Sequence, residues 1–209
     1  MSIISKSPFN FKLGWGDSRS KLEPEQNISK QNEGFVKLVV GLGNIGDKYS
    51  GTRHNIGFEI IDSYAKNQDF PTFKDSKKFF GLITEEFVNG KKIILLKPTT
   101  LMNLSGKSVR AVKDFYNIAP EDMTIIHDEL DLDFGDIRKK DGGEGKSSHN
   151  GLKDITLKLG TSDFKRIRIG IKSPLLAMMG SKDFVLGKFN KEEQSKIKNL
   201  VKNAQSLID

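Results

Sequence analysis

The sequence contains no cysteine among its 209 residues. This absence excludes disulfide bonds, thiolate nucleophiles and sulfur-ligated metal sites, so any catalysis must use other side chains. A chain without cysteine also fits a reducing compartment, and we therefore expect a cytoplasmic protein.

Long apolar segments are missing as well. The sequence has no run of about 18 apolar residues, the length that a helix needs to span a bilayer, and we therefore expect no membrane insertion. The pattern G-x-S-x-G, typical of a serine nucleophile on a tight turn, is also absent. Its absence favours a mechanism without a covalent intermediate.

Basic residues outnumber acidic ones. The 34 Lys and Arg against 27 Asp and Glu give a formal net charge of +7 and a pI near 9.4. Such an excess is typical of proteins that bind a polyanion such as nucleic acid, although it also serves solubility alone. The charge raises the question of RNA binding without deciding it.

The first 36 residues differ from the rest of the chain. They mix single apolar residues with polar ones and show neither the period of a strand nor that of a helix. We predict that residues 1–36 are an N-terminal extension, disordered or loosely packed on the domain. Acidic residues and the lack of a compact apolar block argue against a targeting segment. Residues 37–209 are expected to form one catalytic domain.

From Val36 onward, short apolar runs alternate with amphipathic helical patterns. Strands are predicted at 36–40, 79–87, 92–96, 123–126, near Ile137 and at 166–171, and helices at 55–67, 105–116 and 151–159. This order predicts an α/β fold: a three-layer α/β/α single domain with a mixed, mostly parallel twisted sheet. Asn190 and Glu193 have the spacing of a capping box and should begin a C-terminal amphipathic helix. The segment 172–183 is either a mobile cover over a groove or an ordinary surface loop.

A glycine pattern follows the first predicted strand. Gly41, Gly43 and Gly46 match the dinucleotide-binding pattern G-x-G-x-x-G, which makes a nucleotide-dependent oxidoreductase one hypothesis. In that fold the third glycine lies in a helix, and an acidic residue about 20 positions later ends the second strand. Here residues 47–52 prolong the loop and no acidic strand end lies near position 66, which disfavours the hypothesis. We expect no cofactor.

Polar side chains collect where the predicted parallel strands end. They are Asn44 and His54 after the first strand, Asn103 after the strand 92–96, Asp128 after the strand 123–126, and His149 and Asn150 in a later loop. Because the carboxyl ends of parallel strands lie at one edge of a sheet, these residues should share one cleft. His54 could act as a general base on water, with Asp128 fixing its tautomer, and the Asn side chains could stabilise an oxyanion. The set predicts hydrolysis by an activated water molecule.

The run His127-Asp128-Glu129 could suggest a metal site. Successive residues of a strand point to opposite faces, however, so the three side chains cannot easily ligate one ion. We expect no metal.

Several segments together resemble bacterial-type peptidyl-tRNA hydrolases. They are KLVVGLGNIGDKYSGTRHNIGFEIID, LKPTTLMNLSG, HDELDL, HNGLKDI, FKRIRIGI and FVLGKF, in the order and at the spacing of that family. The resemblance extends from about Lys37 to Phe189. A set of collinear motifs is far more specific than one glycine pattern.

The resemblance implies a role for each matching residue. His54 would be the catalytic base, Asp128 the carboxylate that stabilises its active form, and Asn44 the residue that distinguishes peptidylated from free aminoacyl-tRNA. The remaining implied contacts to the peptidyl-adenosine end are Tyr49, Leu101, Met102, Asn103 and Asn150, with His149 closing the rim. Lys140 and Arg168 would clamp the tRNA 5′-phosphate, with a solvated surface as the alternative.

The implied protein hydrolyses the ester between peptide and tRNA in peptidyl-tRNAs released prematurely from ribosomes, and so recycles tRNA. Its partner is peptidyl-tRNA, and we expect a monomer without an obligate protein partner. The second hypothesis is an RNA-binding module of the same fold that has lost catalysis.

Two departures from the family pattern limit this resemblance. Ser147 and Ser148 stand where a glycine pair is usual before His149, in a loop that is one residue longer. Leu101 stands where an aromatic residue is frequent, which argues against stacking on the substrate there.

Overall fold

A computed structural model describes residues 35–143 and 147–208 of the chain. Except for its last two residues, the predicted extension 1–36 lies outside the described residues, as do residues 144–146 of the loop before His149. Among the described residues, every helix is too short or too polar to cross a bilayer.

A seven-stranded sheet forms the centre of the described part of the chain, with the strand order β2-β3-β4-β1-β5-β7-β6. The strands are β1 (Val36–Gly41), β2 (Lys74–Ser76), β3 (Gly81–Val88), β4 (Lys91–Pro98), β5 (Met123–Asp133), β6 (Ile137–Lys140) and β7 (Lys165–Lys172). The four central strands β4, β1, β5 and β7 are parallel, whereas β2, β3 and β6 are antiparallel to their neighbours. The predicted mixed, mostly parallel sheet is confirmed.

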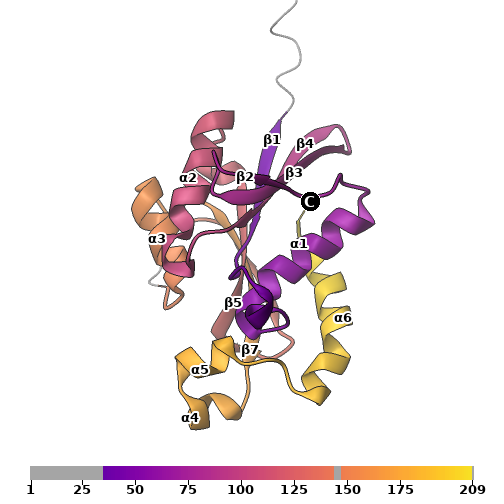
Figure 1. Cartoon of the computed structure of the whole chain (residues 1–209), viewed down its shortest axis with the longest axis vertical. Coiled ribbons are helices and arrows are strands. Elements are labelled where there is room, and N and C mark those ends of the chain that lie inside the picture. Colours follow the sequence, from indigo (N-terminus) through magenta and orange to yellow (C-terminus); the bar gives the residue numbers. More distant parts are fainter. Residues whose placement is uncertain (1–34, 144–146, 209) are drawn as a thin grey trace, which may run out of the picture. The chain divides into compact units, whose positions relative to one another are not determined.

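Helices cover both faces of the sheet (Figure 1). They are α1 (Ile56–Asn67), α2 (Ser105–Tyr116), α3 (Asn150–Leu159), α4 (Leu175–Met179), α5 (Ser181–Leu186) and α6 (Lys191–Gln205), with single 3-10 turns η1 (Asp47–Tyr49), η2 (Arg53–Asn55), η3 (Met102–Leu104) and η4 (Pro120–Asp122). Helices α1 and α6 lie on one face, and α2 and α3 lie on the other. The arrangement is the predicted three-layer α/β/α fold.

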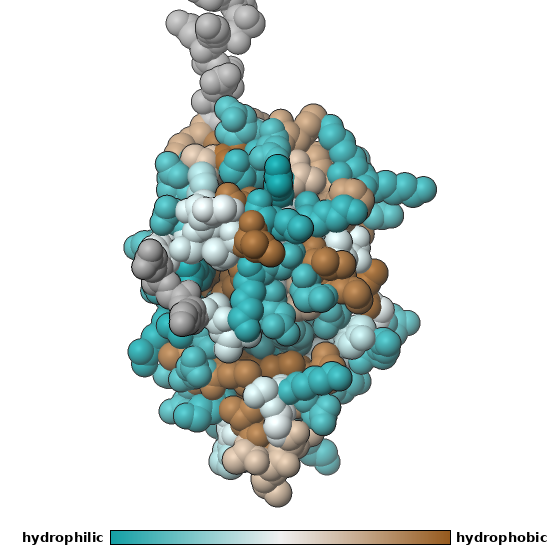
Figure 2. All heavy atoms as spheres, turned by 90° about the vertical axis from the view of Figure 1, so that its left-hand side faces the viewer, coloured by the Kyte–Doolittle hydropathy of each residue, from teal (hydrophilic) through white to brown (hydrophobic). Residues whose placement is uncertain are grey.

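Two apolar cores result from this layering. On one side, Ile60 and Ile61 of α1 and Leu200 of α6 pack against Val39 and Ile126 of the sheet. On the other side, residues of α2 and α3 such as Val109 and Ile155 pack against the opposite faces of the same strands. The alternation of side chains along each strand supplies both cores at once, which explains the nearly continuous apolar runs in the sequence. The face of the molecule on which α2 and α3 lie is mainly hydrophilic, with apolar residues in separate groups (Figure 2).

The local signals in the sequence explain several element boundaries. Asn89 and Gly90 both have positive φ, 51° and 76°, in the two-residue turn between β3 and β4, as the Asn-Gly signal predicts. The capping box of α6 is present, because the Asn190 side chain accepts from the Glu193 backbone and the Glu193 side chain accepts from the Asn190 backbone.

Strand β5 is longer than the predicted strand 123–126. It continues to Asp133, because β7 goes on pairing with it beyond the end of β1, with Asp128 opposite Ile169 and Glu129 opposite Gly170. Strand β1 ends opposite Ile126. Asp128 therefore lies within β5, whereas the sequence predicted a strand that ends before it.

The segment 172–183 is mostly helical, whereas the sequence analysis predicted no helix there and left a mobile cover and an ordinary surface loop as alternatives. It contains α4 and the beginning of α5. The short strand β2 is a further element that the sequence analysis missed. Its three residues have no apolar alternation that could have revealed it.

Candidate active site

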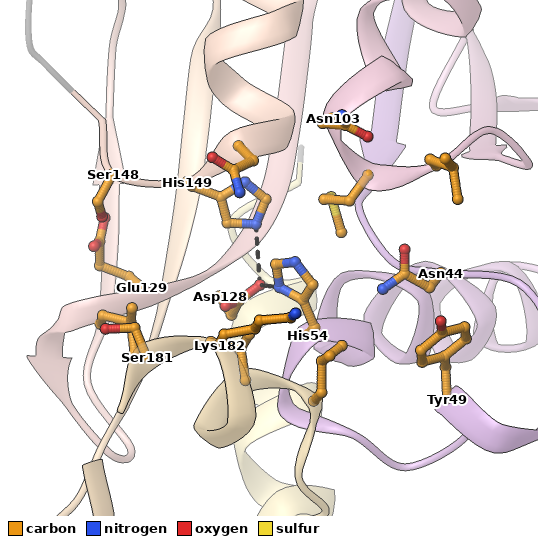
Figure 3. A pocket seen from close by; sticks show the side chains of 16 residues that line it. Asn44, Tyr49, His54, Asn103, Asp128, Glu129, Ser148, His149, Ser181 and Lys182 are labelled. Carbon is orange, nitrogen blue, oxygen red and sulfur yellow. Dashed lines mark hydrogen bonds and ion pairs between the residues drawn. The ribbon is translucent and has the colours of Figure 1, made fainter. Parts of the chain in front are cut away.

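A cavity of about 510 Å³ opens at the carboxyl edge of the parallel strands. The predicted site residues that line it are Asn44, Tyr49, His54, Leu101, Met102, Asn103, Asp128, His149 and Asn150. They come from the loops after β1 and β4, from β5 and from the start of α3 (Figure 3). The convergence expected from the strand ends is therefore present in the structure.

His54 and Asp128 are hydrogen-bonded in this cavity. The distance between His54 Nδ1 and Asp128 Oδ1 is 2.8 Å. Because an ionised carboxylate can only accept, the hydrogen lies on Nδ1, and Nε2 of the neutral ring keeps its lone pair. His54 is therefore in the tautomer that can accept a proton at Nε2.

His149 binds the same carboxylate oxygen from another direction (Figure 3). Its Nε2 lies 3.1 Å from Asp128 Oδ1, while its Nδ1 accepts hydrogen bonds from the backbone N–H groups of Gly151 and Leu152. His149 is thus the N-cap residue of α3. Because capping makes Nδ1 an acceptor, Nε2 carries the hydrogen and donates it to Asp128.

The charge state of Asp128 follows from these contacts. Burial alone would raise the pKa of this carboxyl group, but the attraction and the hydrogen bonds of His149 and His54 outweigh burial and hold the pKa well below its ordinary value. Asp128 is ionised over the whole range in which an enzyme works, and it stabilises a positive charge on His54 when one develops.

The third histidine of the chain lies behind the other two. His127 is completely buried, and its Nδ1 donates to the backbone carbonyl of Asp128 at 2.7 Å. The centroid of its ring lies 5.1 Å from that of the His149 ring. Burial, together with the nearby His149, lowers the pKa of His127 to about 3. His127 is consequently neutral and serves as structural support.

The loop that carries Asn44 is held by a reciprocal pair of hydrogen bonds. Asn44 N donates to the Asn55 side chain at 2.8 Å, and the Asn55 amide donates back to the Asn44 carbonyl at 2.9 Å. The glycine pattern serves this loop by close packing: a Cβ at Gly41 would lie 2.3 Å from the carbonyl oxygen of Gly57 in α1. A Cβ at Gly43 would overlap the Phe58 ring, whereas Gly46 has open space around it and a φ of 104° that favours glycine. Each glycine of the pattern thus has an explanation without a dinucleotide.

The position of His54 is also fixed by the contacts of its neighbour Arg53. The guanidinium group is only 2% exposed. It makes an ion pair of 2.7 Å with Glu193 of α6, donates to the Phe184 carbonyl of α5 at 3.3 Å, and lies 4.2 Å from the Phe184 ring centroid. The turn η2 that presents His54 is therefore fixed to both α5 and α6.

Three donor atoms in the cavity could also hold a metal ion. The ligand atoms of His54, Asp128 and His149 lie within 4.8 Å of one another, the one such group found among the described residues. Two His and one carboxylate are a donor set that suits a transition metal. In the arrangement described, however, both nitrogens facing Asp128 carry the hydrogens that they donate to it, so that an ion would have to displace both.

Lys140 and Arg168 lie outside this cavity. They line an adjacent cavity of about 90 Å³ together with His127, Glu129 and Arg166. Arg168 Nε donates to Glu129 at 2.9 Å. Glu129 and Ser148 contribute to both cavities, so the two adjoin. The predicted phosphate clamp is therefore a neighbour of the catalytic cavity, and its role stays a prediction.

Several residues that line the cavity were not predicted to lie there. They are Glu129, Leu130, Ser148, Ser181, Lys182, Val185 and Leu186. Four of these belong to α5. For Ser181 and Lys182 the sequence offered one signal, the suggestion that the segment 172–183 covers a groove, which named no side chain.

Comparisons with known proteins agree with this geometry. The sequence profile of the family described as peptidyl-tRNA hydrolase matches residues 38–209. A peptidyl-tRNA hydrolase of Ligilactobacillus salivarius is 42% identical over 174 residues, which cover 83% of this chain and 91% of that protein. A peptidyl-tRNA hydrolase of Staphylococcus aureus is 41% identical over 174 residues, which cover 83% of this chain and 90% of that protein.

Solved structures give the same result. The crystal structure of peptidyl-tRNA hydrolase from Acinetobacter baumannii superimposes with a TM-score of 0.74 at 42% identity, over 83% of this chain and 86% of that one. The family profile covers nearly all of the described residues, and relatives share more than 40% identity over most of both chains. The chain belongs to the peptidyl-tRNA hydrolase family.

Proposed function

We propose that the chain hydrolyses the ester that joins a peptide to the 3′ end of tRNA, in peptidyl-tRNAs released prematurely from ribosomes. The observation that carries the proposal is the hydrogen bond of 2.8 Å between His54 Nδ1 and Asp128 in an open cavity. Membership of the peptidyl-tRNA hydrolase family supports the choice of substrate.

The chemistry follows from the protonation states. His54 Nε2 accepts a proton from a water molecule as its oxygen attacks the ester carbonyl. Asp128, ionised and within hydrogen-bond distance, stabilises the imidazolium that forms. Collapse of the tetrahedral intermediate expels the ribose 3′-oxygen, which takes the proton back from His54. General-base catalysis of this kind contributes about 10² to 10⁴-fold to a rate.

The amide side chains of the cavity are suited to binding the substrate and stabilising the oxyanion. Asn44, Asn103 and Asn150 offer N–H donors around the ester, and one well-placed donor to an oxyanion contributes roughly 3 kcal/mol. We assign Asn44 to discrimination of peptidylated from free aminoacyl ends. Tyr49, Leu101 and Met102 line the same cavity, and we assign them to contacts with the peptidyl-adenosine end.

The remaining assignments extend the proposal beyond the cavity. Residues 37–209 act as the catalytic domain, and Lys140 and Arg168 bind the tRNA 5′-phosphate from the adjoining cavity. One chain suffices as a monomer, because every side chain assigned a role belongs to the same chain, and the cytoplasm is the compartment where its substrate arises.

The test is release of peptide from an N-blocked aminoacyl-tRNA by the intact chain and by His54→Ala. We expect release that falls by about 10² to 10⁴-fold in the variant, continues with added chelator, and spares unblocked aminoacyl-tRNA. Binding of tRNA without release by the intact chain would favour a binding module that has lost catalysis. Loss of release with chelator would instead assign the group of His54, Asp128 and His149 to a metal ion.

A further inference from the structure

The catalytic cavity contains a single lysine or arginine side chain among the described residues that line it, that of Lys182. It comes from α5, an element to which the proposed function gives no role. Figure 3 shows the side chain extending from α5 into the cavity, on the side where His54 and Asp128 lie. An ammonium group at this position can bind an anionic group of a ligand, which its surroundings help to identify.

The acidic groups of the cavity are already satisfied. Asp128 accepts hydrogen bonds from two histidines, and Glu129 makes an ion pair of 2.9 Å with Arg168. Within the described parts of the chain, Lys182 has no hydrogen bond or ion pair with any of them, and it is exposed. Its charge is thus available to a ligand that enters the cavity.

The backbone that carries Lys182 is held in place. Phe184, two residues further along α5, is completely buried, and its carbonyl accepts a hydrogen bond from Arg53. The lysine is therefore presented by a fixed helix at the edge of the cavity, and only its side chain is free to move. A fixed stem with a flexible ammonium group suits a ligand that approaches from solvent.

We propose that Lys182 binds the phosphodiester group on the 5′ side of the terminal adenosine of the substrate. This inference rests on the proposed function, because it takes the ester on the terminal ribose to lie at His54. The phosphodiester of the same nucleotide must then lie within one nucleotide's length of the cavity centre. It is the only charged group that the RNA places so close to the ester.

The developing oxyanion is the competing ligand inside the cavity. Stabilisation of an oxyanion requires donors that are preorganised and shielded from water. Lys182 is exposed on a long flexible side chain, whereas Asn44 is half-buried on a loop that its hydrogen bonds with Asn55 hold in place. An exposed ammonium on a long stem acts as a point charge, which is how lysine commonly meets phosphate.

The experiment compares Lys182→Met with the unmodified chain on two esters of the same N-acetylated amino acid. One ester is carried by full tRNA, and the other by adenosine alone, which has no phosphate. Lys191→Met is the matched control, because it removes the same charge from an exposed lysine of α6 that lies outside the cavity. Lys182→Arg retains the charge.

We expect Lys182→Met to lower kcat/KM for the tRNA ester by about five-fold, mainly through KM, the effect of one exposed ionic contact. The slope of log kcat/KM against log salt should become shallower by about 0.7, as for one phosphate contact on a single strand. The adenosine ester should react equally with both proteins. Lys182→Arg should preserve most of the activity, and Lys191→Met should resemble the unmodified chain.

Two results would overturn the inference. An equal loss on both esters would mean that the cation acts on the reacting ester or on the peptide, and no loss on either would mean that Lys182 binds nothing. Failure of the unmodified chain to cleave either ester would contradict the proposed function itself. In that case the affinity of the two proteins for a short RNA ending in CCA still decides whether Lys182 contacts its phosphate.

Discussion

The two partners of the catalytic pair are held by different parts of the molecule. Asp128 lies within β5 and is fixed by its pairing with β7, by the central sheet and by the N-cap residue of α3. His54 lies on the short turn η2, which is attached through Arg53 to α5 and α6 at the periphery. The carboxylate depends on the sheet, whereas the base depends on the contacts of Arg53 with α5 and α6, which include a buried ion pair between residues 140 positions apart.

The difference teaches where each partner is vulnerable. Substitutions in the sheet would disturb the fold before they displaced Asp128. The role of the carboxylate can therefore be tested only by replacing Asp128 itself. The position of His54, by contrast, can be disturbed from a distance through α6. Three predictions test this contrast.

The largest effect is expected from Asp128→Asn. An amide in place of the carboxylate can donate to His54 Nδ1, which would move the ring hydrogen to Nε2 and remove the lone pair needed for catalysis. We expect kcat to fall by about 10² to 10⁴-fold with little change in KM. Steady-state kinetics on an N-blocked aminoacyl-tRNA measure this loss.

Unfolding in urea provides the control for that variant. A loss of activity accompanied by unfolding at the assay temperature would show that Asp128 is needed for folding and would leave its catalytic role unsupported.

The ion pair that holds the base gives the second effect. Arg53→Met leaves the carboxylate of Glu193, which is 5% exposed, without its partner. Removal of one member of a buried pair costs about 3 to 5 kcal/mol of the free energy of unfolding. The double variant Arg53→Met/Glu193→Gln should lose less than Arg53→Met alone, because no charge is left buried, and its amide oxygen can still accept from the Asn190 N–H of the capping box.

Urea denaturation of the two single variants and the double variant measures this coupling. Additive losses would show that Arg53 and Glu193 stabilise the protein independently. That result would contradict the conclusion that their ion pair fixes the turn that carries His54.

The smallest effect concerns His127, which supports the carboxylate side. Its pKa in the folded protein is about 3, below the value of about 6.5 in an unfolded chain. Between these values the unfolded state binds the additional proton, so the stability contributed by neutral His127 is present above pH 6.5 and is lost as the pH falls. From pH 6.5 to pH 5 the loss amounts to about 2 kcal/mol.

His127→Asn should remove this part of the pH dependence, measured as the difference in free energy of unfolding between pH 7 and pH 5. Asp128 adds a dependence of the same sign only at lower pH, below about 4 in the unfolded chain, so it does not obscure the window. An unchanged pH dependence in the variant would mean that His127 takes up a proton in the folded protein.

Much of this structure is predictable from the sequence because its signals are local. The apolar runs, the Asn89-Gly90 turn and the capping box at Asn190 each require only neighbouring residues. The convergence of the polar residues in one cavity was also predictable, since parallel strands bring their carboxyl ends together. What could not be predicted depends on contacts between distant segments. The extension of β5 past Ile126 requires β7, and the entry of Lys182 into the cavity requires the packing of Phe184 on Arg53.

The double use of His149 affects how the preceding loop can change in evolution. The ring is anchored by the backbone of the helix that it caps and by the carboxylate of Asp128. The preceding loop contributes one contact to the backbone of His149, whose N–H donates to Ser147 Oγ at 3.1 Å. A substitution at Ser147 therefore removes a backbone hydrogen bond of His149 but neither of the two anchors of its ring. The anchoring is compatible with Ser147 and Ser148 at positions where a glycine pair is usual, because the contacts that hold the ring come from α3 and β5.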